Sequence, residues 1–172
     1  MEIRAANPND FQGASAVQHA VISGDHPYEY AQNILCSGTV NLVAIHNGTI
    51  VGFISVLLGG LDPNGKHLWE RLRPYLAFVG VLPELQGQYV GAELIRCALQ
   101  ISDPHAASGM WLECSESAAK FYEKVGFVRV TPEAVQQHTG LPPKGAVYRL
   151  ASKPMVGQAA NSSFKADGCA AA

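Results

Sequence analysis

A glycine-containing turn at residues 86–92 joins a predicted strand at residues 75–81 to a predicted helix that begins at Val90. Such a turn directs backbone N–H groups and the positive end of the helix toward one point, which suits a pyrophosphate. The turn has no Gly-Lys-Ser/Thr sequence and lacks the three spaced glycines of a dinucleotide fingerprint. It therefore predicts a phosphate-binding loop of another class, although an ordinary strand-to-helix turn has the same composition.

Tyr122 lies on a second predicted helix at a spacing shared with Ala118, Phe121 and Val125, and Gly126 ends that helix. A phenol can donate a proton to a leaving group in catalysis. A tyrosine at this spacing can equally be a core residue whose hydroxyl reaches a polar partner. The residues alone leave both interpretations open.

Two motifs follow one another along the chain. The first motif reads Val81-x-Pro83-x-x-Gln86-Gly87-x-x-x-Gly91-Ala92. The second motif covers residues 118–127 and reads AAKFYEKVGF. Together they resemble the acyl-CoA-binding motif and the tyrosine-bearing helix of the GNAT N-acetyltransferase superfamily, and the resemblance covers about residues 2–150. Tyr89 stands where the family usually has its middle glycine, and Ser115 stands near the position of a frequent Asn.

The resemblance implies that an acetyl group moves from acetyl-CoA to a primary amine by direct attack through a tetrahedral intermediate, with no metal. By position, Tyr122 would be the general acid, and a backbone N–H near Val79 would bind the thioester carbonyl. The strand before the loop would splay from its neighbour to leave a slot for the thioester. The residues carried over for cofactor binding are Phe78, Val79, Val81, Gln86, Gly87, Gln88, Tyr89, Val90, Gly91, Ala92 and Ser115. For Tyr89, the sequence predicts that its amide faces phosphate and that glycine there would loosen the helix start.

An alkylamine has a pKa of about 10, so some group must take its proton before attack. Residues 75–80 contain no carboxylate, although many relatives have one there. The candidates are therefore Glu113, Glu70, Asp25 and His26, of which Glu113 on the neighbouring strand is the catalytic prediction. Two alternatives remain: Glu113 is a solvent-facing carboxylate, or water removes the proton.

The apolar patterns predict one α+β (mixed α/β) domain. Residues 40–45 and 50–58 form the clearest unit, because Asn47-Gly48 between two β-branched runs favours a type I′ hairpin. The resemblance implies a GNAT-like central, mostly antiparallel twisted sheet of about six or seven strands flanked by about four helices. The other expected elements are strands at residues 2–5, 75–81, 110–114, 127–130 and 147–150, helices at 10–21 (capped by Asp10), 28–35, 90–101 and 118–125, a helical turn or two at 66–72, and a polar loop at 131–146.

Composition limits the class of protein. The 172 residues are 48% apolar and 15% charged with a net charge of −2, and a chain of this length buries roughly two-thirds of its unfolded surface without a scaffold of metals or disulfides. We expect one domain at residues 1–151 and an Ala/Gly/Ser-rich tail at 152–172.

The chain has no basic run that would bind nucleic acid and no apolar run long enough to span a bilayer. Neither nucleic acid nor a membrane is therefore expected as a partner, and the location is expected to be cytoplasmic. The four cysteines and six histidines are dispersed, so no metal site is expected.

The acceptor is the least determined part of this interpretation. Residues 23–30, 59–74 and 131–145 would wall its site, and they mix acidic with basic side chains. A small-molecule amine is slightly favoured over a protein N-terminus or lysine. The rival classes are a catalytically degenerate acyl-CoA-binding or sensor module and a pure interaction domain, and the state is expected to be a monomer or homodimer.

Overall fold

The computed structural model describes residues 1–22, 28–60, 62–102 and 109–150. The expected tail at 152–172 lies outside these residues. Within the described ranges, no helix is both long and apolar enough to cross a membrane.

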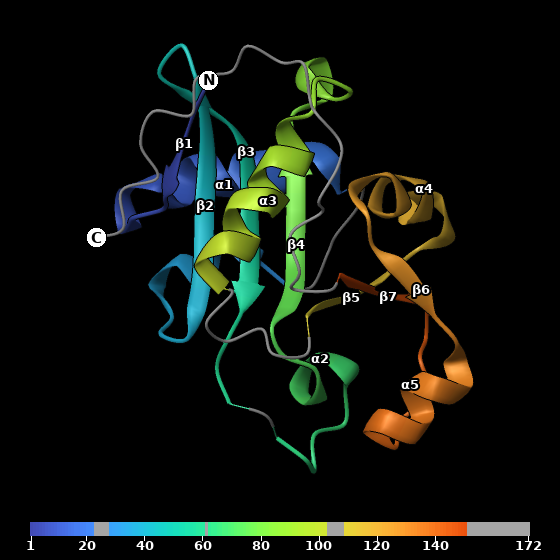
Figure 1. The fold of residues 1–172 in the computed structure, drawn as a ribbon. Coiled ribbons are helices and arrows are strands. Elements are labelled where there is room, and N and C mark those ends of the chain that lie inside the picture. The colour runs from blue at the N-terminus through green and yellow to red at the C-terminus, as the bar shows by residue number, and fades with distance from the viewer. Residues whose placement is uncertain (23–27, 61, 103–108, 151–172) are drawn as a thin grey trace.

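Seven strands form one sheet in the order β1-β2-β3-β4-β5-β7-β6 (Figure 1). All neighbouring pairs are antiparallel except β4 and β5, which run parallel. The expected α+β class with a mostly antiparallel sheet is therefore confirmed. The strands are β1 (Glu2–Ala5), β2 (Thr39–His46), β3 (Thr49–Leu57), β4 (Tyr75–Val81), β5 (Met110–Cys114), β6 (Val128–Val130) and β7 (Ala146–Leu150).

Helices cover both faces of the sheet. Helix α3 (Val90–Ser102) packs on one face of β2, β3 and β4, and α1 (Phe11–Val21) packs on the other face, as Figure 1 shows. Helix α4 (Glu116–Val125) lies beside β7, and α2 (Leu68–Arg71) and α5 (Pro132–Thr139) lie at one end of the sheet. The short 3₁₀ helices are η1 (Pro8–Asp10), η2 (Tyr30–Leu35) and η3 (Pro83–Leu85).

Alternating residues of the central strands fill two separate cores. Leu42 and Ile54 pack with Leu94 of α3, whereas their chain neighbours Val43 and Phe53 pack with Val17 of α1. Successive strand residues point to opposite faces, so a strand covered on both sides reads as an unbroken apolar run. The hairpin is confirmed, because Asn47 and Gly48 both have the positive φ that a type I′ turn requires.

A bulge in β4 separates the two halves of the sheet. Ser55 pairs with Phe78 and the next residue, Val56, pairs with Leu76, so Ala77 is an extra residue in β4. A bulge bends its strand and increases the local twist. Between the described parts of β4 and β5 the pairing is limited to Tyr75 with Trp111. The expected splay is therefore present, and beyond Tyr75 the edge of β4 that faces β5 has no strand partner.

The expected polar loop at residues 131–146 is wrong, because it contains α5. Thr131 accepts a hydrogen bond from the backbone N–H of Ala134, Pro132 occupies the first turn, and Gly140 ends the helix with positive φ. Only one large apolar side chain of this helix, Val135, is buried. The helix therefore has capping signals but lacks the apolar periodicity typical of a helix that packs on a core.

Two smaller expectations also change. The helix expected at residues 28–35 is the 3₁₀ helix Tyr30–Leu35. Asp10 precedes α1 as expected, but its side chain does not cap that helix. Its carboxylate accepts two hydrogen bonds from the Arg4 guanidinium, at 2.7 and 2.8 Å, and one from the backbone N–H of Asn7. Asp10 thus ties β1 to the start of α1.

We expect Asp10→Asn to lower the free energy of unfolding at pH 7 by about 2 kcal/mol, because it leaves Arg4 partly buried without its anion. Hydrogen bonds from Arg4 lower the pKa of the Asp10 carboxyl. Since its folded pKa lies below the unfolded value near 3.9, its stabilisation is present above that pH and is lost as the pH falls through the folded pKa. Urea unfolding at several pH values measures this.

The matched control is Glu93→Gln, which removes the exposed ion pair between Glu93 and Arg96. Such pairs contribute at most about 1 kcal/mol. Equal losses in the two variants would contradict a special role for Asp10.

Candidate active site

The loop between β4 and α3 presents a set of free backbone donors. Gly87 and Tyr89 have φ of 79° and 63°, and α3 begins at the next residue. Within the described residues, the N–H groups of Gly87, Tyr89, Val90, Gly91 and Ala92 have no backbone acceptor. The first N–H groups of a helix have no intrahelical partner, and together with the helix dipole they attract anions.

The side chains of Gln86 and Gln88 stabilise the conformation of this loop by hydrogen bonds to backbone carbonyls. The Gln86 side-chain amide donates to the carbonyl of Val81 at 3.0 Å, and the Gln88 amide donates to the carbonyl of Glu84 at 3.3 Å. Both glutamines therefore brace the loop and leave anion contacts to the backbone.

Two aromatic residues bear on the loop: Phe121 explains why residue 91 is glycine, and Tyr89 replaces the glycine that the family usually has in the middle of the motif. Tyr89 is 84% exposed, so its ring leaves its backbone accessible. A Cβ added at Gly91 would lie 3.2 Å from the ζ carbon of Phe121. Gly91 therefore lets α3 approach α4 closely.

A groove of about 620 Å³ runs between this loop, β4 and α4. Lys120 and Lys124 also line it, and their charges favour a polyanion. The sequence analysis missed these lysines, although their spacing of four residues places them on one face of α4. The free amides, the lysines and the size of the groove fit a ligand that carries a pyrophosphate. Nine predicted site residues line the groove: Val79, Val81, Gln86, Gly87, Tyr89, Val90, Gly91, Ala92 and Tyr122.

Tyr122 lies in this groove with its ring against Phe121 and Phe127, at centroid distances of 5.1 and 5.6 Å. Its hydroxyl makes no hydrogen bond to the described residues. Burial raises its pKa well above the usual value, so the phenol keeps its proton. Tyr122 therefore combines packing of its ring with a free, protonated hydroxyl.

A second, smaller cavity of about 240 Å³ lies beside the bulge of β4. Its lining includes Ala77 of the bulge and Tyr75, whose phenol interacts electrostatically with that of Tyr122. The groove is lined by Val79, two residues further along β4, so the two cavities border neighbouring parts of the strand where it separates from β5. The other residues that line it are Tyr28, Tyr30, Asn33, Leu57, Trp69 and Glu113.

Glu113 lies in this second cavity rather than in the groove. Its Oε1 accepts hydrogen bonds from the backbone N–H groups of Lys144 and Gly145, at 2.5 and 2.6 Å. These two bonds tie β5 to the segment before β7. Its Oε2 makes no hydrogen bond within the described part of the chain.

The remaining candidates lie elsewhere. The side chain of Phe78 is buried in the core beneath α1, and neither it nor Gln88 lines the groove. Ser115 also lies outside the groove lining, and its hydroxyl contacts that of Ser117 at 2.8 Å.

Among the described residues, no carboxylate or imidazole lines the groove. Glu70 accepts a hydrogen bond from the N–H of His67 and so caps α2. Asp25 and His26 fall outside the described residues. No three His, Cys, Asp or Glu side chains gather into a metal site in the ranges that the structure covers.

A comparison with protein-family models matches residues 37–129 to the acetyltransferase (GNAT) domain. This match spans more than half of the chain and runs from before β2 into β6. The chain belongs to the GNAT acetyltransferase family. The family resemblance seen in the two motifs is therefore confirmed, and it is a family whose acyl donor is acetyl-CoA.

Known relatives agree with this assignment. N-alpha-acetyltransferase 30 of Schizosaccharomyces pombe is 27% identical over 92 residues, which are 52% of this chain and 57% of that protein. The chain thus matches little more than half the length of this relative.

Solved structures share the fold at lower identity. An aminoglycoside 6'-N-acetyltransferase complexed with coenzyme A has a TM-score of 0.66 at 16% identity, covering 91% of this chain and all of that one. The ribosomal-protein-S18-alanine N-acetyltransferase of Escherichia coli has a TM-score of 0.62 at 19% identity, covering 95% and 99%.

We expect Gly91→Glu to weaken acetyl-CoA binding by roughly 100-fold or more, because a carboxylate would crowd and repel the pyrophosphate. Gly91→Gln is the matched control, since it has nearly the same size without the charge. Titration calorimetry measures both affinities, and circular dichroism confirms folding. A folded Gly91→Glu variant that binds like the wild type would refute the phosphate-loop assignment.

Tyr89→Gly tests the backbone of the loop. The sequence predicts a cost for glycine here, but the positive φ of Tyr89 reverses that expectation. Relief of about 1 kcal/mol of left-handed strain offsets the entropy cost of glycine, so we expect an unchanged or slightly higher Tm and unchanged affinity.

Gln88→Gly is the control for this substitution. Gln88 does not have positive φ, so glycine there relieves no strain and should lower the Tm. Thermal melting and acetyl-CoA titration are measured on both variants. A tenfold loss of affinity in Tyr89→Gly would mean that the phenol itself contacts the cofactor.

Proposed function

We propose that this protein is an acetyl-CoA-dependent N-acetyltransferase that acts on a primary amine of a small molecule. One observation carries the proposal: a groove with free backbone donors leads to a protonated tyrosine at the opening between β4 and β5, beside a second cavity. The groove suits a nucleotide-bearing acyl donor, and the cavity suits an acceptor.

The groove residues have separate roles in this proposal. The N–H groups of residues 87 and 89–92, with Lys120 and Lys124, hold the pyrophosphate. The unpaired edge of β4 around Val79 and Val81 offers backbone groups to the pantetheine arm. Bound acetyl-CoA supplies an activated acyl group as its thioester. A backbone N–H near Val79 stabilises the charge that develops on the carbonyl oxygen.

Tyr122 is the proposed proton donor to the sulfur of the leaving group. Its hydroxyl has no competing partner within the described structure, and burial keeps it protonated. A positioned phenol that transfers its proton as the carbon–sulfur bond breaks is a general acid.

Glu113 is the proposed acceptor of the amine proton. It lines the cavity in which the amine would lie, and its Oε1 is already held by two backbone donors. This leaves Oε2 as the oxygen available for the substrate, directly or through one water.

A protein N-terminus is the second candidate acceptor. The similarity to an N-alpha-acetyltransferase and the fold shared with a ribosomal-protein acetyltransferase favour it. The small volume of the second cavity favours a small amine or one terminal residue over a large substrate. A cytoplasmic location and a monomeric or homodimeric state stay predictions from the sequence.

An amine panel tests the proposal. The protein and acetyl-CoA are incubated with small amines, peptides and aminoglycosides, and thiol release and a 42-dalton gain in acceptor mass are followed. Binding of acetyl-CoA without turnover of any amine would favour the catalytically degenerate sensor module.

With an active acceptor, we expect Tyr122→Phe to lower kcat while folding and acetyl-CoA affinity change little. General acid catalysis contributes typically ~10²–10⁴-fold, and thiolates leave tolerably without help, so the loss lies in the lower part of that range or below it. Tyr148→Phe is the matched control, because that buried phenol donates to Glu123 and does not line the groove. Unchanged kcat in Tyr122→Phe, when chemistry limits turnover, would assign Tyr122 to packing alone.

A further inference from the structure

We propose that the second cavity selects a singly charged primary amine whose short chain ends in a flat apolar ring, that is, an arylalkylamine. This inference rests on the acetyl transfer proposed above and names the acceptor class of the same site. The cavity has a polar floor with one charge, an aromatic mouth, and the volume of a single ring with a short chain.

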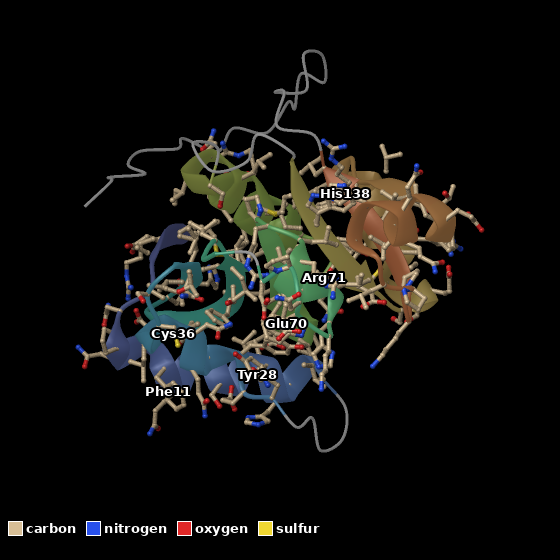
Figure 2. All side chains as sticks on the ribbon, turned by 90° about the horizontal axis from the view of Figure 1, so that it is seen from below. Phe11, Tyr28, Cys36, Glu70, Arg71 and His138 are labelled. Carbon is tan, nitrogen blue, oxygen red and sulfur yellow. The ribbon has the colours of Figure 1, made fainter. Side chains whose placement is uncertain are left out.

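The burial of the lining residues orients the cavity. Tyr75 is only 8% exposed, and Ala77 of the bulge lies two residues further along β4, so these residues form the floor beside the β4–β5 opening. Tyr28 and Trp69 are 46% and 43% exposed and form the mouth. In the view of Figure 2, Tyr28 and Glu70, the neighbour of Trp69 in sequence, project to the same part of the molecule, and Tyr28 and Trp69 line the same cavity. The reacting amine must reach the floor, so the rest of the acceptor passes between the two mouth rings.

Charge is confined to one place in the cavity. Glu113 is the single charged side chain among the described residues that line it, and it lies on β5 beside the opening. Burial raises the pKa of Tyr75 and of Tyr30, so both phenols stay neutral. One ammonium group of the acceptor can therefore pair with the Glu113 carboxylate, and the rest of the acceptor contacts uncharged rings.

Tyr28 and Tyr30 form an aromatic wall of the cavity, and hydrogen bonds hold this wall in place without a ligand. The side-chain amide of Gln18, which is buried in α1, donates to the carbonyl of Tyr28 at 2.8 Å and accepts from the N–H of Tyr30 at 2.7 Å. The Tyr28 hydroxyl donates to Asn33 at 2.8 Å, and Asn33 donates to Ser55 at 2.8 Å. A preorganised wall lowers the entropy cost of binding a rigid ring.

Ring contacts keep the same wall in place. The rings of Tyr28 and Tyr30 make an edge contact at 4.9 Å, and Tyr30 stacks on Phe78 at 5.3 Å. An added ring of the acceptor gains from offset or edge-to-face contacts of this kind.

The mouth is unfavourable for a polycation. The Arg73 guanidinium lies 5.8 Å from the centroid of Trp69 and interacts electrostatically with Glu70, so the charges beside this ring are of opposite sign and offset each other. Glu29 faces α1, where it accepts from Ser15 and pairs with His19. The cavity of about 240 Å³ is also below the size range of drug-sized ligand sites. An aminoglycoside, with several ammonium groups and rings, matches neither the charge nor the volume.

The test compares acceptors with the full chain and saturating acetyl-CoA. Phenethylamine is the probe, n-butylamine lacks the ring, kanamycin is a polycation, and a peptide that begins Met-Leu represents a protein N-terminus. We expect kcat/KM for phenethylamine to exceed that of each other acceptor by about tenfold or more, as an aromatic contact provides. A higher kcat/KM for kanamycin or the peptide would overturn this inference and leave the acetyltransferase proposal intact.

Variants locate the effect in the cavity. Trp69→Ala should raise the KM for phenethylamine about tenfold without changing the KM for acetyl-CoA, and Trp69→Phe should restore most of the loss. Val128→Ala is the matched control, because Val128 is an exposed apolar residue on β6 outside the cavity. Equal effects of Trp69→Ala on butylamine and phenethylamine would contradict a ring-binding mouth.

Binding is measured independently of turnover. Calorimetric titration of phenethylamine into the protein–CoA complex should give saturable binding that Trp69→Ala weakens and Val128→Ala does not. If no amine is acetylated, this titration still decides the inference: binding lost in Trp69→Ala supports the ring site, and absence of binding overturns it. Absence of turnover alone contradicts the proposed activity.

Discussion

The separation of β4 from β5 is the constraint on which the rest of the site depends. Backbone N–H and C=O groups inside a sheet normally pair with the adjacent strand. The extra residue at Ala77 bends β4, and the parallel pair with β5 is limited to Tyr75 and Trp111. The unpaired edge must then be satisfied by water or by a ligand. Ala77 of β4 lines the smaller cavity and Val79 of the same strand lines the groove, so both cavities border the part of β4 that has separated from β5.

Much of this fold could be predicted from sequence, because the central strands are covered on both faces. Their apolar runs and the Asn47-Gly48 turn are strong local signals. Helix α5 was missed because its one buried large apolar residue, Val135, creates no periodicity. The bulge at Ala77 has no local signal, since alanine has no preference for an extra, unpaired position. It follows from the register between β3 and β4, which single-sequence patterns do not contain.

Part of the candidate site could likewise be predicted from the sequence, and part depends on tertiary contacts. The loop at residues 86–92 and Tyr122 each belong to a motif that is visible in the sequence, and the packing of α4 beside α3 and β4 places both on one groove. Glu113 was found as a carboxylate on the neighbouring strand, but its bonds to Lys144 and Gly145 depend on contacts more than thirty residues apart. Residues 23–30 and 59–74 were expected to wall the acceptor site, and they include Tyr28, Tyr30 and Trp69 of the smaller cavity. The bonds from Gln18 that hold Tyr28 and Tyr30 could not be predicted, because Gln18 looks like an ordinary polar residue on a helix. Its near-complete burial, at 2% exposure, is visible only in three dimensions.

The two cavities draw on different stretches of the chain. The smaller one is built from residues between Tyr28 and Ala77 with Glu113 added, and the groove is built from residues between Val79 and Val125 with Val21 added. The boundary falls inside β4, directly after its bulge. With the acceptor in the smaller cavity and the donor in the groove, as proposed, recognition of the acceptor and retention of the donor are genetically separable. A recombination or a cluster of mutations confined to the first half of the gene could change the acceptor while the machinery for the donor is inherited intact.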